Sequence, residues 1–223
     1  MEYKEIICLA NSIKLGGRCV AGKEIDNHSW IRPVSELHSG ELSEDQIKYV
    51  NGEDPKLLEI IKIPFKSKSP KCYQPENLIV GDGKWQKTGR FREEDLDKIC
   101  ENPLVLWDNN HPDNGKISLG YLKSHPPASS LLLIKVDLLK IVRSNYEEEK
   151  KYRAVFNYNG EDYDLPVTDP KIRKEYENNI PGDYLLGGKK FYVCVSLGAP
   201  FKKIPNSSED ACCYKLVAAI IYV

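Results

Sequence analysis

Hydrophobic and polar residues alternate in short runs along this chain, with the period of two that is typical of β-strands with one buried face. In the first third of the chain the pattern predicts four strands, over residues 3–10, 17–25, 29–34 and 57–65. Gly16 and Gly17 separate the first two runs and predict a tight hairpin turn, because glycine readily adopts φ > 0. Pro33 cannot donate to a sheet ladder, which predicts an edge or a bulge at the end of the third strand.

Two segments of the first half lack this alternation. Residues 36–55 hold six acidic residues and one basic residue, which predicts a surface loop or a short helix around Glu44–Val50. Residues 92–100 carry acidic side chains at their start and are followed by Pro103, which predicts a short helix. Further strands are expected around that helix.

The second half follows a cleaner order. A long strand over 131–143 precedes a hairpin whose turn is Asn159-Gly160, a dipeptide typical of two-residue turns. Asp169 and Pro170 predict the start of a helix that runs to about Tyr176. Two more apolar strands follow, over residues 189–197 and 213–223. Three strands, a helix and two strands is the order of the OB-fold, a five-stranded Greek-key barrel.

The same template fits the first half less closely, because residues 57–80 contribute one or two strands more than it needs. His125-Pro126-Pro127 is a candidate hinge between the halves. We therefore predict a mostly β protein, α+β by content, made of two small OB-like β-barrels with short helices. The expected domains are residues 1–125, a first barrel with inserted loops, and residues 126–223, a second barrel.

Composition narrows the possible roles. The formal net charge of −1 argues against a protein whose whole surface binds polyanions, so nucleic-acid affinity requires a local basic patch. The chain has no apolar run long enough to span a membrane and no secretion signal at its start, which predicts a cytoplasmic protein with no membrane partner. Its seven cysteines are odd in number and lie mostly in apolar runs, which predicts reduced core thiols.

The glycine turn is the first candidate site. Small, polar and basic side chains flank it, so backbone N–H groups and positive charge are expected to converge on an anion such as a phosphate. Two arginines on neighbouring strands would grip that phosphate, and a tryptophan would stack on a base. The alternatives are salt bridges to the acidic 36–54 segment and a tryptophan packed in the core. The predicted ligand site comprises Asn11, Ser12, Lys14, Gly16, Gly17, Arg18, Trp30 and Arg32.

A second candidate patch lies between residues 56 and 92, where nine bases face three acids and aromatic residues are interleaved. Ionic contacts to a nucleic-acid backbone and flat rings for stacking would then occur together. The alternative is a solvated, lysine-rich loop whose aromatic side chains pack inward. The patch is represented by Lys84, Trp85, Lys87 and Arg90.

Catalytic and metal-binding patterns are weak. The Gly16-Gly17 pair leads into a strand rather than a helix, and the chain has no Walker sequence, which argues against a P-loop hydrolase. The cysteines and histidines lack metal-ligand spacing. Asp162 and Asp164 share one strand face and would suit metal-assisted cleavage, but an exposed hairpin face explains them more simply. We expect no catalytic residue, metal or cofactor, and an enzyme using these aspartates or a cysteine remains an open alternative.

Several segments resemble the dual OB-containing domain proteins of bacteria. The segments lie at both ends of the chain: Cys8–Ser12, Gly16–Gly22, Trp30–Ser35, Val195–Gly198 and Tyr214–Ala219. The resemblance implies two barrels and a nucleic-acid-binding or nucleotide-binding module in prokaryotic conflict or defence. It implies no catalytic residue.

Together these observations predict a non-catalytic OB-type module that binds single-stranded DNA or RNA. The alternative is a sensor that binds a small nucleotide or a phosphorylated metabolite, since one compact anion site in a near-neutral chain suits such a ligand equally well. A binding module of this kind is expected to work with an effector protein encoded nearby.

Overall fold

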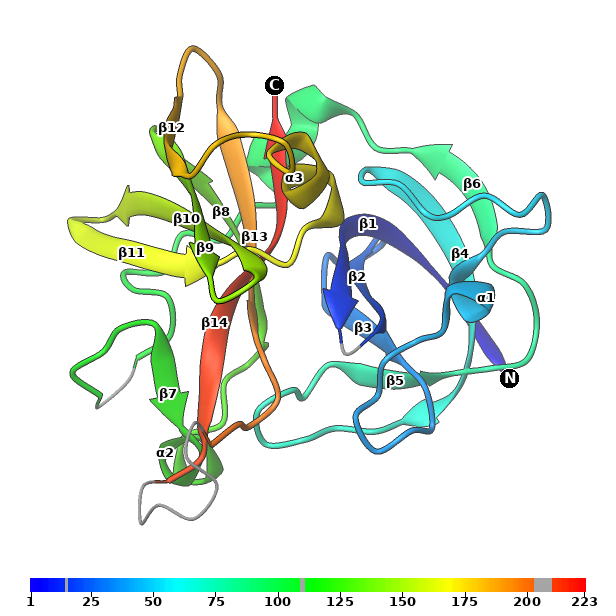
Figure 1. Ribbon diagram of the computed structural model, residues 1–223. Helices are drawn as coiled ribbons and strands as arrows, with labels where there is room; N and C mark the ends of the chain where they lie inside the picture. The colour runs from blue at the N-terminus through cyan, green and yellow to red at the C-terminus, as the bar shows by residue number, and fades with distance from the viewer. Residues whose placement is uncertain (15, 109–110, 203–209) are drawn as a thin grey trace.

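The computed structural model describes residues 1–14, 16–108, 111–202 and 210–223. Figure 1 shows two halves side by side, the N-terminal one in blue to cyan and the C-terminal one in green to red. The N-terminal half is built from β1 (Glu2–Lys14), β2 (Gly17–Glu24), β3 (Trp30–Val34), α1 (Glu44–Ile47), β4 (Glu59–Lys68), β5 (Asn77–Val80) and β6 (Gln86–Arg90).

The first half is a closed five-stranded barrel. Its strands follow the order β1-β2-β3-β5-β4, and β4 returns to pair with β1. The β3–β5 pairing is parallel and the other pairings around the barrel are antiparallel. α1 lies between β3 and β4 in the chain, where Ser43 and Gln46 form a capping box. This is the strand order of an OB barrel, with β6 added to β4 at the outside.

Alternation along β1 directs side chains to two different environments. Ile6 and Cys8 point into the barrel core, where they join a cluster that includes the fully buried Trp85. Ile7 and Leu9 point outward, yet neither is accessible to solvent. The first barrel therefore has an apolar outer face as well as an apolar interior, and that outer face must be covered.

The second half is a half-barrel of two four-stranded sheets. One sheet has the order β11-β10-β9-β12 and the other the order β7-β14-β13-β8. A parallel bridge between Val167 and Val217 links the end of the hairpin to β14. The elements are β7 (Lys116–Ser118), α2 (Leu119–Ser124), β8 (Leu131–Val136), β9 (Leu139–Tyr146), β10 (Glu149–Tyr158), β11 (Glu161–Pro166), α3 (Pro170–Glu175), β12 (Gly182–Leu186), β13 (Phe191–Leu197) and β14 (Cys212–Tyr222).

The mostly β architecture with two OB-like units is confirmed, including several local details. Asn159 and Gly160 have φ values of 50° and 86°, as a two-residue hairpin turn requires. The Asp169 side chain accepts hydrogen bonds from Lys171 N and Ile172 N, and Pro170 occupies the first turn of α3. Local signals at these positions were sufficient because the turn and the cap are decided by adjacent residues.

Other details differ from the sequence prediction. The first half, not the second, is the closed barrel, because the extra strands around 57–80 are its β4 and β5. The predicted helix over 92–100 is a 3₁₀ helix, η1 (Glu93–Lys98). The strand expected over 131–143 is interrupted between β8 and β9. β3 is not an edge strand: it pairs with β2 before Pro33 and with β5 around it, so the missing N–H falls where the β2 ladder has ended.

The expected boundary at residue 125 stays a prediction. β7 precedes that boundary in the chain, but it pairs with β14 of the second half. The connection between η1 and β7 therefore crosses from one half to the other before His125.

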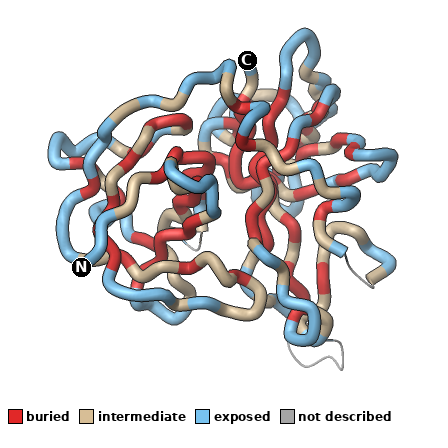
Figure 2. The backbone as a smooth tube through the Cα atoms, turned by 180° about the vertical axis from the view of Figure 1, so that it is seen from behind, coloured by how far each residue is buried: buried red, intermediate tan, exposed pale blue. Residues whose placement is uncertain are grey.

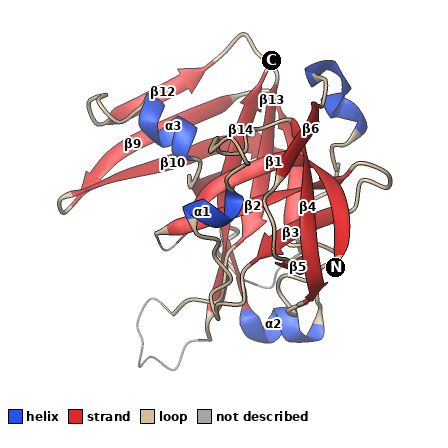
Figure 3. Ribbon diagram, turned by 90° about the vertical axis from the view of Figure 1, so that its right-hand side faces the viewer, coloured by secondary structure: helices blue, strands red, loops and turns tan. Residues whose placement is uncertain are grey.

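The two halves are joined by a buried seam. The outer face of β1, β2 and β3 packs against the outer face of β8, β13 and β14, and Figure 2 shows buried backbone concentrated in the middle of the molecule. Figure 3 shows β13 and β14 behind β1 from the side. Leu9 and Ala21 of the first barrel belong to the same cluster as Leu133, Cys194 and Ala219 of the second half. Burial of this apolar area is the main attraction that holds the halves together.

Candidate functional site

The β1–β2 hairpin lies at the seam. Ile13 N donates a hydrogen bond of 3.0 Å to the carbonyl oxygen of Thr168, in the second half. Gly16 has a φ of 82°, which favours glycine. A Cβ at Gly17 would lie 2.7 Å from the carbonyl oxygen of Leu42, so that glycine permits close packing within the protein. The amide of Arg18 donates to the same carbonyl oxygen at 2.8 Å. This side of the turn is therefore covered by the chain itself, and the Arg18 amide is not available to a phosphate.

Arg32 is the polar centre of the seam. Its Nε donates to Glu76 Oε1 at 3.0 Å, and its Nη2 donates to Ser130 Oγ at 2.8 Å and to Ser196 Oγ at 3.1 Å. Nη1 lies 3.2 Å from Cys19 Sγ. Both side chains of the Arg32–Glu76 pair are at least 96% buried. Arg32 therefore binds the second half of the protein, and the prediction that it grips a solvent-facing phosphate is wrong in this arrangement.

The two predicted stacking rings both pack against the protein, Trp85 fully and Trp30 in part. Trp85 is 1% exposed and fills the first barrel, so its assignment as a stacking ring is wrong. Trp30 packs against the seam, where its Nε1 donates to Glu101 Oε1 at 2.8 Å and Lys23 lies over its ring. Both tryptophans thus contribute to packing, which was the alternative for each.

The second predicted patch is largely neutralised by its own surroundings. Lys87 pairs with Glu59 at 2.8 Å and Arg90 pairs with Glu93 at 3.0 Å. Lys84 donates to the carbonyl oxygen of Asp45. Lys87 and Arg90 are therefore neutralised, while Lys84 has no carboxylate within 4.0 Å among the described residues. Trp85 points inward between them, so the patch lacks the exposed ring that the sequence predicts.

The remaining predicted residues line two cavities, one on either side of the hairpin. The β13 cavity, of about 420 Å³, takes Ser12, Lys14 and Arg32 from the first barrel. Its other wall comes from the second half and is mainly apolar, with Leu197, Pro200, Phe201, Tyr214 and Leu216. The Asn11 cavity, of about 960 Å³, is lined by Asn11, Arg18 and Asp54 of the first barrel and by Asp169, Lys171, Lys174 and Tyr222 of the second half.

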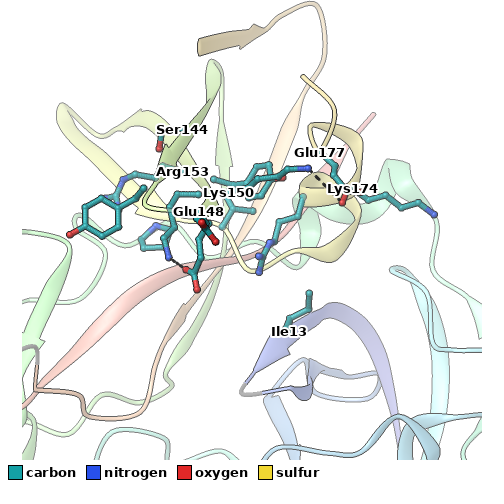
Figure 4. A pocket seen from close by; sticks show the side chains of 14 residues that line it. Ile13, Ser144, Glu148, Lys150, Arg153, Lys174 and Glu177 are labelled. Carbon is teal, nitrogen blue, oxygen red and sulfur yellow. Dashed lines mark hydrogen bonds and ion pairs between the residues drawn. The ribbon is translucent and has the colours of Figure 1, made fainter. Parts of the chain in front are cut away.

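A third and larger cavity lies between these two. This α3 cavity, of about 1210 Å³, is bounded by the β9–β10 hairpin and α3, with Ile13 of β1 at its edge (Figure 4). Part of its positive charge is neutralised, because Lys150 pairs with Glu177 at 3.9 Å and Lys151 pairs with Glu149. In Figure 4 Lys174 extends away from that pair along α3.

The three cavities form a series along the seam. The β13 and α3 cavities share Ile13 and Pro166, and the α3 and Asn11 cavities share Lys174. We call this series the seam groove. It includes Asn11, Ser12, Lys14 and Arg18, but in two separate compartments, and their role as one ligand site stays a prediction.

Four cations along the seam groove have no carboxylate within 4.0 Å among the described residues: Lys14, Lys171, Arg173 and Lys174. Lys14 Nζ donates to the carbonyl oxygen of Ser39. Burial lowers the pKa of Lys14, and the nearby cations Arg32 and Lys71 lower it further. An anion beside Lys14 would therefore stabilise its charged form.

The sequence interpretation missed the three bases on α3. Lys171, Arg173 and Lys174 directly follow the Asp169-Pro170 cap, so their presence on one short helix was visible. Their position opposite β1 was not, because it depends on how the halves pack. Lys171 Nζ lies 4.6 Å from the Tyr222 ring centre and the Arg173 guanidinium lies 5.5 Å from that of Tyr152.

Within the described residues, no three His, Cys, Asp or Glu side chains gather as a metal site. The described helices include none with the length and apolar character needed to span a bilayer.

A family model described as a dual OB-containing domain matches residues 4–220. No curated protein matches the chain. The solved structures similar to it include the tetrameric p202 HIN2, at 7% identity and a TM-score of 0.35, covering 100% of this chain and 94% of that one. They also include the p204 HINb domain, at 12% identity and a TM-score of 0.34, covering 97% and 96%.

Proposed function

This chain belongs to the dual OB-containing domain family, and from that premise we propose that it is a non-catalytic module that binds single-stranded nucleic acid along the seam groove. The observation that carries the proposal is the series of three adjoining cavities lined by cations without carboxylate partners. An extended groove with unneutralised charge suits a polyanionic chain better than it suits a compact metabolite.

The groove also offers exposed rings. Phe201, at the β13 cavity, is 60% exposed, and Tyr146, at the α3 cavity, is 65% exposed. Aromatic faces that remain open beside cations allow bases to stack while phosphates contact the charges. These two rings would take the stacking role predicted for Trp30 and Trp85, since Trp85 is buried and Trp30 packs at the seam.

The face at which OB-folds usually bind oligonucleotides lies next to the seam groove. Oligonucleotides commonly bind OB-folds across strands two and three and the adjoining loops. In the first barrel the outer face of β2 and β3 is covered by the second half, so only its margins stay open. The seam groove runs along one of those margins, beside the β1–β2 turn.

A salt titration tests the proposal. Binding of labelled single-stranded DNA and RNA would be measured by fluorescence anisotropy, and we expect affinity to fall steeply as salt rises. In a variant with K14Q, K171Q, R173Q and K174Q, the slope of log affinity against log salt should decrease in magnitude by about 0.7 for each phosphate that is no longer bound, or up to about 3 in total.

A quadruple variant, K68Q, K84Q, K98Q and K123Q, is the matched control, because it removes the same number of positive charges and these exposed lysines lie outside the three cavities. It should bind as the wild type does. An equal reduction of affinity in both variants would indicate non-specific attraction, and wild-type protein that binds neither DNA nor RNA would overturn the proposal.

The second candidate function is a sensor for a small nucleotide or phosphorylated metabolite. The β13 cavity favours it, since a volume of about 420 Å³ with mainly apolar walls lies in the range of small-molecule sites, and Lys14 is its one cation without a carboxylate partner among the described residues. A thermal-shift comparison separates the two: stabilisation by mononucleotides without any response to oligonucleotides would favour the sensor. A role in prokaryotic defence and an effector encoded nearby remain predictions of the same kind.

A further inference from the structure

Buried polar atoms without hydrogen-bond partners gather at one place in this protein. Seven such side-chain atoms occur among the described residues, and three of them belong to residues that line the Asn11 cavity. They are Asn11 Oδ1, Arg18 Nε and Asp54 Oδ1. Buried polar groups are nearly always paired in folded proteins, so three orphaned atoms in one cavity call for a partner that the chain does not supply.

The surroundings explain why the chain leaves these atoms unpaired. Asn11 is 9% exposed, and its Nδ2 donates to the carbonyl oxygen of Pro55 at 2.8 Å, which fixes the amide and leaves Oδ1 as an acceptor. Arg18 Nη2 lies 3.5 Å from Asp54 Oδ2. A closed two-pronged pair would also join Nε to Oδ1, and both of these atoms are unpartnered. The Arg18–Asp54 pair is therefore held open.

The three unpaired atoms are two hydrogen-bond acceptors, Asn11 Oδ1 and Asp54 Oδ1, and one donor, Arg18 Nε. A ligand that satisfies them presents two N–H groups and one oxygen acceptor on a single edge. Guanine does so, with N1–H and the N2 amino group as donors and O6 as acceptor. Thymine and uracil present one N–H between two carbonyl oxygens, and cytosine and adenine each present one amino group beside ring acceptors. Guanine is the common base whose edge matches this set.

Resting on the proposed function, we propose that the Asn11 cavity reads a guanine base of the bound strand. Asn11 Oδ1 and Asp54 Oδ1 accept the two N–H groups, and Arg18 Nε donates to O6. The base reaches these atoms by parting the open Arg18–Asp54 pair, which the Asp54 side chain permits because it is 41% exposed. Lys171 and Lys174, on the opposite wall, lie where they can contact the adjoining phosphates.

The first test changes only the ligand. Oligothymidine would be compared with the same strand carrying one guanine, one inosine or one adenine, with affinity measured at fixed salt. We expect guanine to improve affinity about tenfold over thymine, as a well-matched base contact does. Inosine lacks the N2 amino group and should lose most of that gain. Equal affinity for all four strands would overturn the guanine assignment while leaving strand binding intact.

The second test changes the protein. D54A should abolish the guanine preference, whereas the affinity for plain oligothymidine should not fall, because the variant removes a negative charge from the groove. E53A is the matched control, because Glu53 is an adjacent acidic residue lining the same cavity with no orphaned atom. It should retain the preference, and loss of preference in both variants would overturn the assignment.

Failure of the proposed function is distinguishable from failure of this inference. If no oligonucleotide binds, calorimetry with guanosine and thymidine monophosphates tests the cavity alone. Binding of the guanosine form that D54A abolishes would support the guanine site in a nucleotide sensor. Absence of binding by both monophosphates would overturn it.

Discussion

The two halves share an OB-like strand order but use it in opposite ways. The first barrel is closed around its core, and its outer β1–β3 face is sealed by the second half. The second half is only half closed, and it presents α3 with three bases to the open side. The barrel that resembles a binding module most closely thus contributes the sealed surface, and the less regular half contributes much of the free charge. Whether a residue is accessible to a ligand therefore depends on where it lies relative to the seam, and not on how closely its half resembles a complete OB barrel.

The largest change in the free energy of unfolding is expected for a variant at Arg32, where the two halves are joined. R32A would leave Glu76 buried without its cation and should lower the free energy of unfolding by about 3–5 kcal/mol, measured by denaturant titration. R153A is the control, because Arg153 and Asp164 form a solvent-exposed pair whose removal should cost at most about 1 kcal/mol. Similar costs for both variants would contradict the account of Arg32 as the centre of the seam.

A somewhat smaller change in stability is expected in the second half, from the ionisation of one buried lysine. Lys215 on β14 is 1% exposed, and burial lowers its pKa to about 8. Between pH 8 and 10.5 the unfolded chain therefore binds more protons at this residue than the folded chain does, so stability should rise with pH across that window. The total rise should be of the order of 3 kcal/mol.

K215M should remove that rise and gain stability below pH 8. The measurement is denaturant titration of both proteins from pH 7 to 11. A wild-type stability that falls or stays level through this window, relative to K215M, would show that the buried amine is not penalised.

The smallest change in stability is expected for G16A, a variant that also tests whether the glycine turn binds the ligand. G16A places a side chain at a φ of 82° with open space around it, so only backbone strain is expected, about 1 kcal/mol of stability. Affinity for oligonucleotides should stay unchanged, because the ligand contacts assigned here come from side chains along the groove. A large drop in affinity would restore the turn amides as the anion receptor.

The sequence was informative wherever neighbours in the chain decide the structure. Asn159-Gly160 and Asp169-Pro170 specify their turn and cap without help from elsewhere, so both were predictable. Arg32 shows the limit. Its partners Glu76, Ser130 and Ser196 lie 44 to 164 residues away, so an arginine on a strand predicted to neighbour the glycine turn was mistaken for a ligand-binding residue.

The predicted stacking role of Trp85 was wrong for a related reason. It stands among lysines in the sequence, yet its side chain enters the barrel while its neighbours face out, which only the closure of the barrel decides. The cavities beside the hairpin were likewise invisible, since each takes walls from both halves. Asn11, Ser12, Lys14 and Arg18 lie near one another because they share the β1–β2 hairpin, while their role in binding stays a prediction.

The hydrogen bonds from Arg32 to Ser130 and Ser196 also restrict how the two halves can move. They fasten the halves directly to each other, so a clamshell motion about the prolines at 126–127 would break the buried hydrogen bonds from Arg32 to both serines. We therefore expect a nucleic-acid strand to enter the seam groove from the side, without separation of the two halves. Association would then be limited by encounter and not by any rearrangement of the two halves.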